Sequence, residues 1–140
     1  MKPRITVLTL GVDNLERSLE FYKNGLHLPT EGIVGQEFEN GAVAFFDLQN
    51  GFKLAIWERK SLAKEANVPL SPRSPSEYTI GHNVSSKAEV DQVMLEAETA
   101  GAKITDPAKD TFWGGYSGHF LDLDGHLWEV VWNPEWEVED

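Results

Sequence analysis

Residues 120–129 read Phe-Leu-Asp-Leu-Asp-Gly-His-Leu-Trp-Glu and carry the strongest local structural pattern in the chain. An Asp-Gly pair favours a tight turn, and apolar residues recur on both sides of it. The pattern predicts one strand over residues 116–123 and a second over residues 126–132, joined as a hairpin. Earlier in the chain, residues 42–48 and 52–57 predict a second hairpin of the same kind.

The two hairpins belong to a longer internal repeat. Asp47 and Leu48 correspond to Asp122 and Leu123, and each hairpin turn contains a glycine. A strand and then an amphipathic helix precede each hairpin. The predicted strands are residues 5–12 and 78–84; the helices begin at Asp13 and Ser86 and end at Asn24-Gly25 and Gly101. Short edge segments are expected over residues 32–39 and 103–105. The repeat therefore predicts two strand–helix–strand units of similar design.

The chain of 140 residues has the length of one domain. We expect a single domain with module one at about residues 4–58 and module two at about residues 78–134. Residues 59–77 contain a short helix-like run followed by three prolines among serines, which is typical of a linker. Residues 135–140 form an acidic tail.

Composition excludes several function classes. Lysine and arginine number 12 and aspartate and glutamate 23, so the net charge is −11. Such a protein repels phosphate backbones and anionic membranes, so we expect neither nucleic acid nor a membrane as partner. The absence of cysteine excludes disulfides and cysteine-based metal sites or nucleophiles. With no predicted signal peptide or membrane span, the expected location is the cytoplasm.

Three stretches together resemble the vicinal oxygen chelate superfamily, the glyoxalase, bleomycin-resistance and dioxygenase group. They are Leu8-Thr9-Leu10-Gly11-Val12-Asp13-Asn14-Leu15-Glu16-Arg17-Ser18-Leu19-Glu20-Phe21-Tyr22, Gly81-His82-Asn83-Val84 and residues 120–129. The resemblance implies an α+β fold of two βαβββ modules that form a curled mixed β-sheet cup, with the helices packed outside. It also implies a homodimer.

Metal enzymes of this family place one ligand on each of four strands, because a divalent ion needs several converging donors. The family's last ligand position corresponds to Glu129, which supplies a carboxylate. The other three positions correspond to Val7, Ala55 and Thr79, which lack good donors. The sequence therefore predicts no metal cofactor, with Glu129 as the one weak candidate ligand if a divalent metal is bound.

Glu129 is also the candidate catalytic residue. Leu127, Glu129 and Val131 share one face of the last strand, and Trp128 and Trp132 lie on the opposite, apolar face. A carboxylate on the face that points into a cup would have a raised pKa and could transfer a proton or pair with a cation. The alternative is a surface carboxylate or a partner for an arginine.

Apolar and aromatic side chains are expected to line the cup, where they suit a small organic ligand. Trp57 and Trp113 could equally serve the core or a dimer interface. His119 lies on a face that the pattern does not decide, whereas His82 is expected in the core and His126 at the surface. The full set of expected ligand-binding residues is Val7, Thr9, Ala55, Trp57, Thr79, Asn83, Trp113, Tyr116, His119 and Val131.

Three functions remain open. The first is a dimeric protein that binds a small organic molecule without a metal. The second is a glyoxalase-related lyase, isomerase or dioxygenase, in which Glu129 is a metal ligand or general base and His119, or another residue outside the family pattern, completes the site. The third is a structural dimer without a ligand. Whether the protein is an enzyme is therefore undecided by its sequence.

Overall fold

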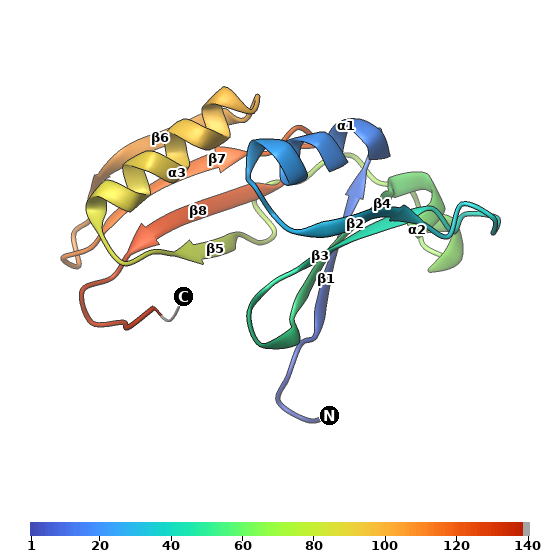
Figure 1. Cartoon of the computed structure of the whole chain (residues 1–140), viewed down its shortest axis with the longest axis horizontal. Coiled ribbons are helices and arrows are strands. Elements are labelled where there is room, and N and C mark those ends of the chain that lie inside the picture. The colour runs from blue at the N-terminus through green and yellow to red at the C-terminus, as the bar shows by residue number, and fades with distance from the viewer. Residues whose placement is uncertain (139–140) are drawn as a thin grey trace. The chain divides into compact units, whose positions relative to one another are not determined.

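The structure is a computed structural model that describes residues 1–138. The chain divides into two compact units between Pro72 and Arg73, inside the proline-containing segment 59–77. Module one therefore extends to Pro72, and module two begins at Arg73. Each module contains one four-stranded sheet, whose strands are labelled in Figure 1.

Module one begins with a parallel strand pair that a helix connects. Its elements are β1 (Val7–Val12), α1 (Leu15–Glu20), the π-helical turn η1 (Phe21–Gly25), β2 (Thr30–Val34), β3 (Val43–Asp47), the 3-10 turn η2 (Gln49–Gly51), β4 (Lys53–Glu58) and α2 (Arg59–Glu65). The strand order is β1-β4-β3-β2, in which β1 runs parallel to β4 and the other neighbours are antiparallel.

Module two repeats this arrangement. Its elements are β5 (Ile80–Asn83), α3 (Lys87–Thr99), β6 (Lys103–Asp110), β7 (Tyr116–Leu121) and β8 (Leu127–Trp132). The strand order is β5-β8-β7-β6, again with one parallel pair, β5 and β8. The predicted fold class, α+β with two βαβββ modules, is therefore confirmed.

Each sheet has one face covered by its own helix and one face that the helix leaves open. In module one, alternate residues of the central strands point toward α1 and η1. The buried side chains on this face are Leu10, Val12, Ala44, Phe46, Leu54 and Ile56, and η1 adds Phe21 and Tyr22. Burial of these side chains supplies the core of module one, since apolar burial is the main driving force of folding.

In module two, α3 packs against β6, β7 and β8 (Figure 1). Val90, Met94 and Ala97 form its buried stripe. Gly118 of β7 allows the close approach, because a Cβ there would lie 2.8 Å from Met94 Cε. Across residues 1–138, no helix is both long and apolar enough to cross a bilayer.

Helix starts differ between the modules. Ser86 caps α3 as predicted, since its Oγ accepts the N–H of Glu89 at 3.2 Å. The N–H of Ser85 donates to Glu89 Oε2 and lowers the pKa of that carboxyl. In module one the predicted cap at Asp13 is wrong by one residue: Asn14 Oδ1 accepts the N–H of Arg17 at 2.8 Å.

The edge strands also differ from the sequence prediction. β2 occupies residues 30–34, earlier than the expected 32–39, and β6 extends to residue 110 rather than ending at 105. Both strands lie at sheet edges and both have shifts in their pairing register. Such irregular edge strands give a weak alternation pattern, and β6 contains Pro107, a residue that is unfavourable inside a strand.

Candidate functional site

The candidate site lies on the open face of the sheet of module two. Four residues, one from each strand, are direct neighbours in the strand register across this face. Gly81 pairs with Glu129, Glu129 with His119, and His119 with Asp106. Residues directly opposite each other on neighbouring strands have adjacent side chains. We call Asp106, His119 and Glu129 the polar row, with Gly81 at its β5 end.

The three side chains of the polar row approach one another closely. His119 Nδ1 lies 3.5 Å from Asp106 Oδ2, and His119 Nε2 lies 3.7 Å from Glu129 Oε1. Lys109 Nζ donates to Asp106 Oδ1 at 2.7 Å. This hydrogen bond is the main reason why the pKa of Asp106 is lowered, and His119 adds to the effect. The row thus contains a histidine between two carboxylates, one of them held ionised by a lysine.

Glu129 differs from Asp106 in its charge environment. Its side chain is 30% exposed, and its ion contact within residues 1–138 is with His119, with no lysine or arginine inside 4 Å. On the other side of Glu129, Gly81 presents no side chain. A Cβ built there would find Asn83 Oδ1, at 3.9 Å, as its nearest neighbour among the described residues. Space therefore remains beside the Glu129 carboxylate.

Further predicted ligand-binding residues lie on the same open face. Asn83 pairs with Val131 in the register of β5 and β8, two residues from Gly81 and Glu129 respectively. Thr79 precedes β5, and its hydroxyl donates to the Leu127 carbonyl at 3.5 Å. The sheet of module two therefore brings Thr79, Asn83 and Val131 to the same face as the polar row.

Tyr116 lies on the opposite face of this sheet, against α3. Its hydroxyl donates to Asp91 Oδ1 at 2.7 Å, which is the main reason why its pKa is raised. Lys87 Nζ lies 5.5 Å from the centre of the Tyr116 ring and 5.8 Å from that of Trp132. These contacts stabilise the beginning of α3 and separate Tyr116 from the polar row.

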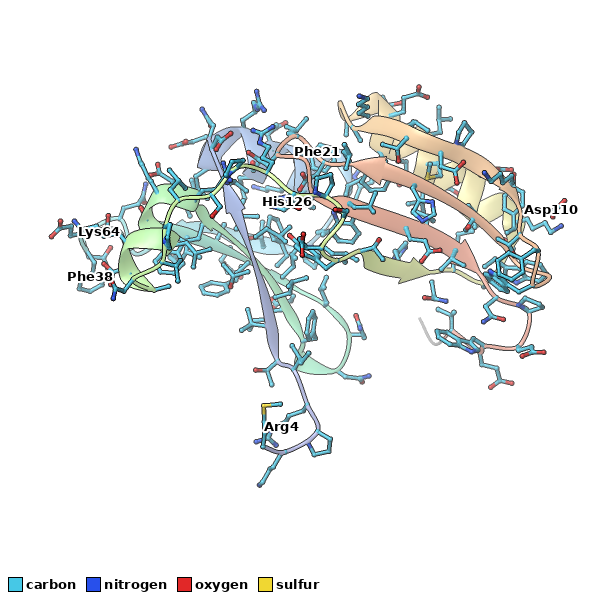
Figure 2. The ribbon with its side chains drawn as sticks, turned by 180° about the vertical axis from the view of Figure 1, so that it is seen from behind. Arg4, Phe21, Phe38, Lys64, Asp110 and His126 are labelled. Carbon is cyan, nitrogen blue, oxygen red and sulfur yellow. The ribbon has the colours of Figure 1, made fainter. Side chains whose placement is uncertain are left out.

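Trp113 lies in the loop between β6 and β7, at one end of the sheet. Asp110 lies at this end of the sheet of module two. The turn between β7 and β8, which contains His126, lies at the opposite end of the same sheet (Figure 2). Trp113 is 44% exposed, and its ring covers Gly115, where a Cβ would approach it to 2.1 Å. The structure thus places Trp113 beside the sheet end and outside the polar row.

Two histidine predictions are wrong. His82 was expected in the core and is exposed, because β5 is an edge strand. His126 was expected at the surface, yet only 13% of its side chain is exposed, and its Nδ1 lies 2.7 Å from Asp122 Oδ2. The buried Asp122 carboxylate draws His126 inward, since a buried charge needs a partner.

The remaining predicted residues, Val7, Thr9, Ala55 and Trp57, lie on the open face of module one. Thr9 pairs with Ala55, which is buried, whereas Val7 is 44% exposed. The Trp57 indole N–H donates to the Asn40 carbonyl at 2.7 Å, which fixes the ring. The open face of module one thus combines apolar and aromatic side chains with the Lys53–Asp47 ion pair, which lies beside Val7.

The family relationship follows from comparison with known proteins. A sequence model of the Glyoxalase/Bleomycin resistance protein/Dioxygenase superfamily matches residues 4–130, which is most of the chain. The chain belongs to this superfamily. Comparison with curated proteins gave no match.

Solved structures of superfamily members have the same fold. A glyoxalase-related enzyme from Fulvimarina pelagi is 33% identical, with 98% of this chain and 93% of that chain covered and a TM-score of 0.84. A glyoxalase/bleomycin resistance protein/dioxygenase from Nocardioides is 25% identical, with 100% and 89% covered and a TM-score of 0.74. Lactoylglutathione lyase from Agrobacterium tumefaciens is 20% identical, with 99% and 100% covered and a TM-score of 0.70, which shows the fold alone.

The residues at the superfamily's four metal-ligand positions do not fit a divalent ion. Val7 and Ala55 have no donor atom in their side chains, and the Thr79 hydroxyl is bonded to the Leu127 carbonyl. Glu129 alone offers a good ligand. No group of three or more histidine, aspartate and glutamate residues within the described chain is arranged to hold a metal ion. Transition metals are bound by several converging nitrogen, oxygen or sulfur donors, which these positions do not supply.

Two residues of the site, Asp106 and Lys109, are not apparent from the sequence pattern. Both lie beyond the segment 103–105 that was expected to be extended. They are three residues apart, yet both face His119 and its neighbours, because the register shifts between them. A strand pattern with a bulge at Pro107 would have been needed to place them on one face.

Proposed function

We propose that the protein binds a small organic molecule on the open face of module two, with Glu129 and His119 as polar contacts and without a metal ion. The observation that carries the proposal is the polar row, which groups a histidine and two carboxylates beside the unfilled position at Gly81. Ligand sites combine a few placed polar groups with apolar surface. Leu127 supplies apolar surface next to Glu129, and the buried Val131 lies on the same face of β8.

Replacing Glu129 with glutamine tests this proposal. We expect ligands found by screening a small-molecule library against the wild-type protein to bind Glu129→Gln at least about tenfold more weakly. A hydrogen bond to a charged group contributes about 1.5–3 kcal/mol, and tenfold corresponds to about 1.4 kcal/mol. Tryptophan fluorescence and thermal shift provide the measurement.

The matched control is Glu98→Gln, which changes an exposed glutamate on α3 and should leave binding unchanged. A Glu129→Gln protein that binds every ligand as tightly as the wild type would contradict the proposed site.

A second candidate function is acid–base catalysis by the same residues. It is favoured by the position of His119, whose two ring nitrogens face Asp106 and Glu129. A histidine oriented by a carboxylate is a common general acid or base. In this case Glu129 would act as the base and accept a proton from the ligand. His119 would then exchange a proton with Glu129. Conversion of a bound ligand to product would distinguish catalysis from binding alone.

Measuring the metal content of the purified protein tests whether the ligand site works without a metal ion. Protein purified without a tag or chelator, and then dialysed against Zn²⁺, Ni²⁺, Mn²⁺ or Fe²⁺, is expected to hold far less than about one ion per chain. The reason is that only one of the four superfamily ligand positions has a strong donor. Elemental analysis gives the ratio. About one tightly held ion per chain would favour a metal-dependent lyase or dioxygenase with Glu129 as ligand.

We propose a homodimer that works in the cytoplasm, with a small organic molecule as its ligand. The net charge of −11 makes nucleic acid and anionic membranes poor partners.

A further inference from the structure

We propose that the β5 end of the polar row binds an organic cation, with an ammonium or amidinium group placed over Gly81 and against the Glu129 carboxylate. This inference rests on the proposed function and adds the chemical class of the ligand. It follows from the order of charges along the row, from the missing side chain at Gly81 and from a second acceptor next to it.

Basic and acidic side chains alternate along the polar row from β6 to β8, where the row ends with the Glu129 carboxylate. Lys109 pairs with Asp106 at 2.7 Å, Asp106 faces His119, and His119 faces Glu129. With His119 neutral, one positive and two negative charges remain. With His119 protonated, the sum is zero, but the β5 end of the row is still a carboxylate. In both states a positive group on the Gly81 side of Glu129 would continue the alternation and be attracted.

The position next to Glu129 has room for such a group. Gly81 is the direct partner of Glu129 in the parallel pair of β5 and β8, and its backbone is not in the positive-φ region that requires glycine. The nearest described atom to a Cβ at this position is Asn83 Oδ1, at 3.9 Å. Glycine is therefore not needed here for backbone conformation, and its effect is to leave space beside a half-buried carboxylate.

Two hydrogen-bond acceptor groups lie near this space. Glu129 contributes carboxylate oxygens and Asn83 contributes Oδ1, whereas the Thr79 hydroxyl already donates to the Leu127 carbonyl. An ammonium group has three donors, and an amidinium group has a planar set of them, so both could bond to two acceptors at once. An anionic group would be repelled by the Glu129 carboxylate. The net charge of −11 adds a long-range attraction for cations.

Probe molecules of similar size separate the effect of charge from the effect of shape. We expect benzylamine and benzamidine to bind the full-length protein at least about tenfold more tightly than benzyl alcohol, measured by NMR titration. Their binding should disappear in Glu129→Gln and persist in Glu98→Gln. Equal binding of benzyl alcohol and benzylamine would overturn the cation inference. So would displacement of benzylamine by a tightly held divalent metal ion.

The failure of the inference is distinguishable from the failure of the proposed function. If uncharged library ligands bind in a Glu129-dependent manner while both cations fail, the binding site stands and its assignment to cations is wrong. If neither the cations nor any library ligand binds, both are wrong.

A second experiment needs no ligand. Gly81→Lys places a tethered ammonium opposite Glu129, and Gly81→Gln is its neutral counterpart of similar length. We expect the folding equilibrium constant of Gly81→Lys to exceed that of Gly81→Gln by about two- to fivefold, the range of a cross-strand charge pair. The difference should vanish when Glu129 is also changed to glutamine. No difference between the two variants in the presence of Glu129 would overturn the inference.

Discussion

Phe120→Ala is expected to lower the free energy of unfolding by about 3–5 kcal/mol, the usual cost of truncating a buried phenylalanine. Phe120 is 1% exposed, and its ring stacks on Trp128 with centroids 6.1 Å apart. The substitution would leave a cavity between the sheet of module two and α3. Urea denaturation followed by tryptophan fluorescence would measure the loss, with Trp128 as a direct neighbour of the change.

Phe112→Ala is the matched control for this experiment. Phe112 belongs to the same module but is fully exposed in the loop between β6 and β7. Its truncation should alter stability by less than about 0.5 kcal/mol. A Phe120→Ala protein within about 1 kcal/mol of the wild type would show that module two does not depend on this core contact.

Asp122→Ala is expected to cost a similar amount, about 3–5 kcal/mol, because it removes the acceptor shared by several buried groups, each of which costs about 1–3 kcal/mol when it is left unsatisfied. The Asp122 carboxylate is 1% exposed. Its Oδ1 accepts the N–H groups of Asp124 at 3.0 Å and His126 at 2.8 Å, and its Oδ2 faces the His126 ring. Alanine would leave these buried groups without this acceptor. Thermal unfolding monitored by circular dichroism would measure the effect.

Asp122→Asn separates the two contributions of the carboxylate. Asparagine keeps an acceptor for the turn N–H groups but loses the charge opposite His126, so its destabilisation should be smaller than that of alanine. If alanine is tolerated with a loss below about 1 kcal/mol, the turn would be held by the Asp-Gly backbone alone.

Local patterns in the sequence predicted the repeat and the orientation of its last hairpin. Alternation in β8 correctly separated Glu129 from Trp128 and Val130, because a strand places successive side chains on opposite faces. The glycine-containing turns and the Ser86 cap are equally local, since each depends on only a few consecutive residues. These features therefore follow from the chain without knowledge of its tertiary contacts.

Contacts between distant segments could not be predicted in the same way. Tyr116 was placed among ligand-binding residues, but its hydroxyl bonds to Asp91 of α3, which the sequence gives no means of pairing with it. Asp106 reaches His119 only through the shifted register of an edge strand that contains a proline. Part of the candidate site was thus predictable. The alternation of apolar and polar residues in β8 indicated the face on which Glu129 lies, whereas the position of Asp106 beside His119 depends on how the strands pair.

Because each member of the polar row comes from a different strand, the row also reports on folding. A slip of one residue between β7 and β8 would turn His119 or Glu129 to the face covered by α3 and separate the pair. A ligand that requires both side chains would thus bind only molecules with native pairing. The number of ligand molecules bound per chain at saturation would therefore measure the correctly folded fraction of a preparation. At about 100 times its Kd, it would stabilise that fraction by about 2.7 kcal/mol against unfolding.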